Sequence, residues 1–181
     1  EEIFKLDPTN TEMELLLVRA VNIAEFNIIN SPVYYWEEGH YLEGEPQNYP
    51  LSSYRSWSSV TKDQLQRMLT MIDKRIKYGF GGTTTWLSAK AFIQYLDRQY
   101  TEASKTLSQT LLSSEMNIAA QQQNNITAAL IFVSTLTQFD AASEERLAEM
   151  IGRINTDNSP KREQAERYIL RLAGDIYERN G

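Results

Sequence analysis

The sequence predicts an all-α fold, a helical bundle of five to seven helices with one long irregular aromatic-rich loop. Three observations lead to this prediction. Apolar residues recur at spacings of three and four through most of the chain, as on one face of a helix. Residues 83–151 contain neither glycine nor proline. No segment alternates polar and apolar residues as a half-buried strand does, and no hairpin signal joins two runs.

Length and composition predict one domain over residues 1–181. A chain of this length can bury a sizeable core, and 41% hydrophobic with 23% charged residues is ordinary for a globular protein. The chain contains no cysteine, which excludes disulfides, thiolate metal sites and cysteine nucleophiles. A net charge of −6 disfavours binding to nucleic acid through a general basic field. Because the numbering begins at Glu1, we expect a missing upstream segment, and an exported or cell-surface protein is slightly favoured over a cytoplasmic one.

Residues 126–139 predict the central buried helix. This stretch carries no charge, and its apolar residues cover nearly every side of a helix. Its 14 residues rise only about 21 Å, short of the roughly 30 Å hydrocarbon core of a bilayer. We therefore expect a helix enclosed by other helices, with no transmembrane span.

The first helices are predicted from their end signals. Thr11 and Glu14 fit a capping box that starts a helix with a wide apolar face, ending near Asn30 before Pro32. The next helix is expected to start at Thr61 and to end at Gly79, which suits the left-handed residue that follows a helix.

The second half of the chain predicts longer helices. An unbroken apolar stripe predicts one helix over residues 86–120, with a break at Tyr100–Thr101 as the alternative. The Gln/Asn run 121–125 is the predicted turn before the central helix. Asp140 or Ser143 is expected to cap the following helix, with Leu147, Met150, Ile151 and Ile154 inward. Ser159 and Pro160 start the last helix, with the buried face Ala165, Tyr168, Ile169, Leu172, Ala173, Ile176 and Tyr177.

Catalytic and metal motifs have little support. His40 is the single histidine, and Glu37, Glu38, Glu43 and Glu45 surround it in sequence, which suggests a carboxylate–imidazole metal site. The spacing matches no metal motif, so a solvated acidic loop is favoured. No nucleophile elbow or nucleotide-binding loop is present either. We therefore expect no cofactor, no metal and no enzymatic activity, although an enzyme using His40 stays open.

Residues 31–59 hold the strongest functional signal, because half of the ten tyrosines and two of the three tryptophans fall there. The rings either pin a long ordered loop to the bundle or form an interface, since Tyr and Trp are frequent at binding hot spots. Rings beside carboxylates also suit a small-molecule or carbohydrate ligand. The candidate binding residues are Tyr34, Tyr35, Trp36, Glu37, Glu38, His40, Tyr41, Tyr49, Tyr54 and Trp57.

The main functional hypothesis is a soluble, non-enzymatic protein–protein interaction or assembly domain, with its contact surface on residues 34–57. Residues 1–60 hold ten acids and three bases, so this part suits a basic partner or the basic face of its own next helix. Uncharged polar residues crowd 101–125. That surface is interpreted either as packing against another subunit or as solvated.

Overall fold

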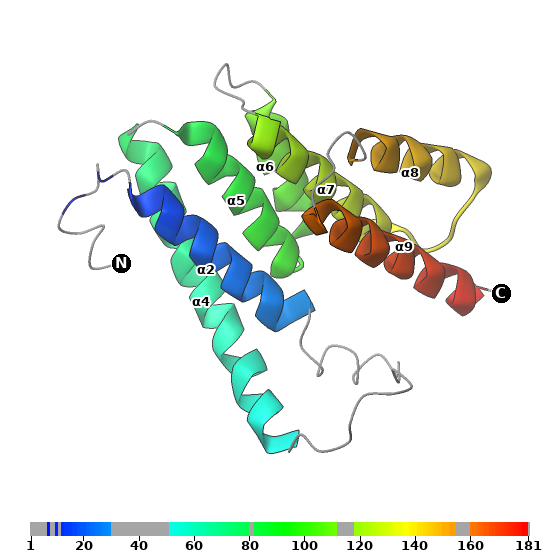
Figure 1. Ribbon diagram of the computed structural model, residues 1–181, viewed down its shortest axis with the longest axis horizontal. Helices are drawn as coiled ribbons and strands as arrows, with labels where there is room; N and C mark the ends of the chain where they lie inside the picture. Colours follow the sequence, from blue (N-terminus) through cyan, green and yellow to red (C-terminus); the bar gives the residue numbers. More distant parts are fainter. Residues whose placement is uncertain are drawn as a thin grey trace. The chain divides into compact units, whose positions relative to one another are not determined.

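The computed structural model describes residues 7, 10, 12–29, 51–79, 82–111, 118–154 and 160–180 (Figure 1). Within these residues the fold is all-helical and contains no strand, which confirms the predicted class. The helices are α2 (Glu12–Ile29), α4 (Leu51–Tyr78), α5 (Thr83–Leu96), α6 (Tyr100–Thr110), α7 (Ile118–Thr135), α8 (Ala141–Ile154) and α9 (Pro160–Asn180).

The chain divides into two compact units, Glu1–Gly81 and Gly82–Gly181. We call them unit 1 and unit 2 and describe each by itself. The expectation of one domain over residues 1–181 stays a prediction.

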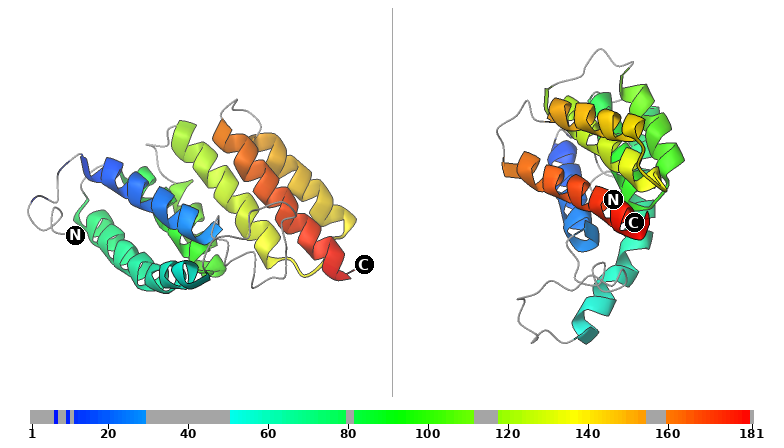
Figure 2. Two further views of the ribbon diagram at one scale, coloured as in Figure 1. Left: turned by 60° about the horizontal axis from the view of Figure 1, so that its bottom comes forward. Right: turned by 90° about the vertical axis from the view of Figure 1, so that its right-hand side faces the viewer.

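In unit 1, α2 packs against α4, and the two helices lie side by side in Figures 1 and 2. Spacings of three, four and seven bring the buried residues of each helix onto one face. These residues are Met13, Leu17 and Ala24 on α2 and Leu65, Leu69 and Ile72 on α4. At the start of α2, the Asn10 Oδ1 atom accepts a hydrogen bond of 2.8 Å from the Glu12 amide. The predicted cap at Thr11 lies outside the described residues.

Helix α4 differs most from its predicted bounds. It begins at Leu51, so the predicted start at Thr61 is wrong, and the last part of the predicted loop 31–59 is helical. The helix begins right after Pro50 and meets no other proline or glycine before Gly79, so no strong breaker interrupts it. Gly79 ends the helix as predicted, with a left-handed φ of 69°. The rest of the predicted loop, residues 31–50, lies outside the described residues.

In unit 2, α7 contacts α5, α6, α8 and α9 (Figures 1 and 2). Every residue from 122 to 134 is buried or half-buried, because helices cover α7 on several sides. The helix runs from Ile118 to Thr135, so it begins and ends before the predicted 126–139. The predicted turn at 121–125 is wrong, since these residues form part of α7 and Asn124 is buried.

The predicted continuous helix over 86–120 is also wrong. Helix α5 ends at Leu96 and α6 starts at Tyr100, close to the alternative break. Between them, the Gln99 amide donates to the Gln94 carbonyl, and Arg98 has a left-handed φ of 59°. The residue before α6 is Gln99, which makes no side-chain capping bond. The left-handed conformation of Arg98 could not be predicted from the hydrophobic pattern, because L-residues other than glycine rarely adopt it.

Side chains near the ends of α7, α8 and α9 fasten these helices together. The rings of Phe139 and Tyr177 stack with their centroids 4.9 Å apart. The Tyr177 hydroxyl donates to Glu144, and this bond raises the pKa of the tyrosine. The Asn180 amide donates to the Thr137 carbonyl at 2.8 Å. Tyr177 was predicted to be buried and is instead 48% exposed, because it contacts the connection before α8 rather than the core.

Asp140 caps α8, as predicted. Its Oδ1 atom accepts a 2.8 Å hydrogen bond from the Ser143 amide. Hydrogen bonds from the Ser143 side chain and then from its backbone lower the pKa of the Asp140 carboxyl group. Pro160 is the first residue of α9, also as predicted, while Ser159 lies outside the described residues.

Asp140→Ala is expected to lower the stability of unit 2 and to weaken its dependence on acid. Because the folded-state pKa is lowered, the stabilising contribution of Asp140 is present above the unfolded pKa of about 3.9. It is lost as the pH falls through the folded-state pKa. Thermal unfolding between neutral pH and pH of about 3 would measure both effects. Asp140→Asn keeps an acceptor, so it should retain more stability at neutral pH but lose the same acid dependence.

Candidate functional site

The predicted contact segment lies largely outside the described residues. Tyr34, Tyr35, Trp36, Glu37, Glu38, His40, Tyr41 and Tyr49 all fall in the range that the structure does not describe. Tyr54 and Trp57 lie on α4, where the structure describes their backbone but not their side chains. The interface, carbohydrate and His40 hypotheses for this segment therefore stay predictions.

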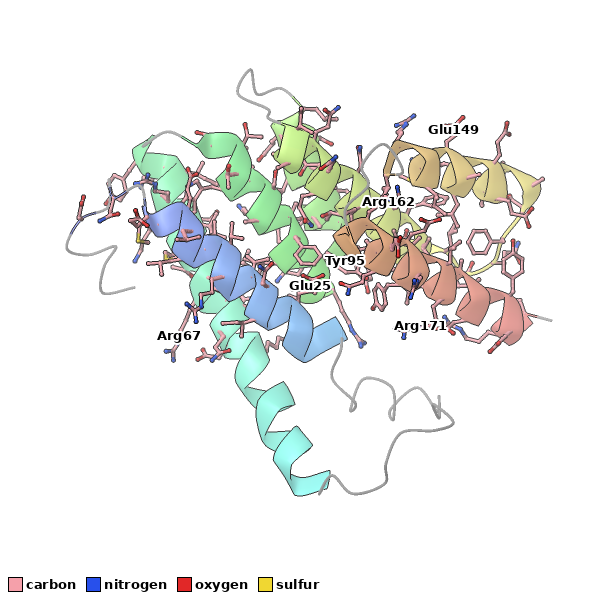
Figure 3. The ribbon with its side chains drawn as sticks, in the orientation of Figure 1. Glu25, Arg67, Tyr95, Glu149, Arg162 and Arg171 are labelled. Carbon is pink, nitrogen blue, oxygen red and sulfur yellow. The ribbon has the colours of Figure 1, made fainter. Side chains whose placement is uncertain are left out.

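Among the described side chains, no three His, Cys, Asp or Glu residues gather to form a metal site. Several ion pairs instead join exposed residues one helical turn apart. These pairs are Asp63–Arg67, Glu102–Lys105, Glu149–Arg153 and Glu163–Arg167. Figure 3 shows Arg67 on the outer side of α4, where its guanidinium group lies 2.7 Å from Asp63. Such exposed pairs are common on helix surfaces and point to no charged reaction centre.

Helix α2 has the wide apolar face that its sequence predicts, and part of this face is exposed. Leu15, Leu16, Val18 and Ile23 are all exposed, with Leu15 at 65%. We call these four residues the outer α2 surface. The signal for it was already present, because residues 15–18 are consecutive apolar positions and successive residues point about 100° apart around a helix. One neighbouring helix cannot cover all of them.

A second unexpected feature is a polar seam inside unit 2, made of Gln94 on α5, Thr106 and Thr110 on α6, and Asn124 on α7. All four are buried. The Thr106 hydroxyl donates to Gln94 Oε1 at 2.7 Å, and Asn124 Nδ2 donates to Thr110 Oγ1 at 2.9 Å. Thr106, Thr110 and Asn124 belong to the polar stretch 101–125, which the sequence predicts to be a subunit contact or a solvated face. These three bond to each other or to α5 within the unit instead.

None of the helices in the described part of the chain is long and apolar enough to cross a membrane. Comparisons with protein-family models, curated proteins and solved structures find no match to this chain.

Proposed function

We propose that this chain is a non-enzymatic protein–protein interaction or assembly domain. Its contact surface comprises the aromatic segment 34–57 and the outer α2 surface. The observation that carries the proposal is the exposure of four large apolar side chains on one helix. Clustered exposed apolar residues are typical of surfaces that bind other macromolecules, whereas single ones are ordinary.

The surroundings of these residues support an interface. Glu12 and Arg19 are exposed on the same helix, so the apolar side chains lie among charged ones. A mixed surface of this kind resembles the apolar centre and polar rim of protein interfaces. Helix α2 does not depend on these side chains for its packing on α4, because Met13, Leu17 and Ala24 face inward. The outer α2 surface is therefore available for contact without unfolding unit 1.

Sedimentation velocity over a wide concentration range tests the proposal through self-assembly. We expect the wild-type chain to associate as its concentration rises. The double substitution Leu15→Ser with Ile23→Ser should weaken this association at least about tenfold, because it removes apolar area from the contact. Circular dichroism of each variant checks that the helices remain folded.

The matched control is Leu111→Ser with Ile118→Ser, which changes two apolar residues of unit 2 that are even more exposed. This control should associate like the wild type. Equal association of the wild type and the α2 variant would show that the outer α2 surface is not part of the contact. A chain that stays monomeric at every concentration would contradict assembly through it.

A further inference from the structure

The fully buried side chains of helix α6 are small or polar, and its larger apolar residues Tyr100 and Leu107 are only half-buried. Its buried residues are Ala103, Thr106 and Thr110. Its neighbours bury much larger apolar groups, such as Trp86, Phe92 and Ile93 on α5 and Leu130, Ile131 and Val133 on α7. The free energy gained by burial scales with the apolar area removed from water. Docking of α6 therefore contributes less than docking of either neighbour.

The hydrogen bonds of the seam add little to this docking. Thr106 bonds to Gln94, and Asn124 bonds to Thr110, whose own hydroxyl donates to the Leu107 carbonyl at 2.7 Å. In the two bonds that join different helices, Thr106–Gln94 and Asn124–Thr110, the neutral groups exchange their protein partners for water when the helices separate. Their net contribution to stability is consequently much smaller than their number suggests.

Asn124 makes separation easier still. Its Oδ1 atom is buried and has no hydrogen-bond partner among the described residues. If the oxygen and nitrogen of the amide were exchanged, the amide nitrogen would take the same buried position and would itself have no hydrogen-bond partner there. A buried polar atom without a partner has a desolvation cost, and water relieves this cost when α6 moves away.

The two ends of α6 differ in how they are attached. At the first turn, the ring of Tyr100 lies 5.8 Å from the ring of Tyr95 on α5, and Figure 3 labels Tyr95 on that helix. Arg98, in the connection between α5 and α6, holds a left-handed conformation that L-residues rarely adopt. At the far end, the apolar side chain of Leu111 is 73% exposed, so the attachment there consists of the buried Thr110 and its neutral hydrogen bond to Asn124. Separation should therefore begin at the Thr110 end and pivot near Arg98.

We propose that α6 undocks from α5 and α7 while the rest of unit 2 stays folded. Unit 2 thus contains a built-in opening motion, located at the polar seam. The proposal concerns unit 2 alone and does not depend on the outer α2 surface or on the aromatic segment.

Native-state hydrogen exchange at increasing low concentrations of denaturant tests this proposal. The amides of residues 104–110 should exchange through an opening with a smaller free energy and a weaker denaturant dependence than the buried amides of α5 and α7. Within α6, protection should decrease toward Thr110. If the α6 amides exchange only with global unfolding, at the same free energy as α5 and α7, the proposal is overturned.

Substitutions in the seam provide the second measurement. Thr110→Val with Asn124→Leu removes one bonded pair together with the unpartnered oxygen, and exchange of the α6 amides should slow by about tenfold relative to those of α5. Gln94→Leu with Thr106→Val removes the other pair and serves if the first variant misfolds. Ser108→Ala, at an exposed position on α6, should leave exchange unchanged. Equal changes in α5, α6 and α7 in a folded seam variant would show a purely global effect and overturn the proposal.

Discussion

Replacing Trp86 by alanine is expected to lower the free energy of unfolding by about 3–5 kcal/mol. The indole side chain has no exposed surface and is the largest fully buried side chain described. Its loss removes a large apolar area from the interior and leaves a cavity that the surrounding helices can only partly fill. Urea unfolding followed by far-ultraviolet circular dichroism would measure the change.

The comparison variant is Leu111→Ala, in which an exposed apolar side chain is shortened. It should change the free energy of unfolding by no more than about 0.5 kcal/mol. Similar small effects for both variants would mean that Trp86 is not enclosed as described.

Leu17→Ala is expected to destabilise unit 1 by about 2–5 kcal/mol. The Leu17 side chain is almost fully buried on the face of α2 that packs against α4. Leu15→Ala makes the same chemical change only two positions away, on the exposed side of the same helix, and should cost no more than about 0.5 kcal/mol. Because both variants gain the same helix propensity, their difference isolates burial.

Thermal unfolding of the two leucine variants would measure this difference. A Leu15 variant as unstable as the Leu17 variant would contradict the exposure of the outer α2 surface. It would also weaken the proposed function, which depends on that exposure.

Local signals predicted several element ends correctly. Asp140 before α8, Pro160 at the start of α9 and Gly79 after α4 each supply a property that a helix end requires. The predictions were wrong at positions where the residue type does not indicate whether a helix continues or ends. The break near Arg98 relies on a left-handed arginine, and the Gln/Asn run 121–125 is helical because its surroundings outweigh the weak helix propensity of asparagine.

The candidate site was less accessible to sequence reasoning. Hydrophobic spacing identifies α2 as apolar but does not identify which side meets α4, so Leu15 and Leu17 look equivalent before the fold is known. The burial of the polar seam could not be predicted either, because Thr and Asn are common on solvated helix faces. The aromatic segment was the clearest sequence signal, and eight of its ten candidate residues fall outside the described chain.

The enclosure of α7 has a consequence for how this chain tolerates mutation. An amphipathic helix such as α8, which buries only Leu147 and Ile154, should show sensitive positions separated by runs of tolerant ones. Along α7 this alternation of sensitive and tolerant positions should be absent, because every residue from 122 to 134 is buried or half-buried. Saturation mutagenesis should then show residues 122–134 as one continuous stretch of intolerant positions.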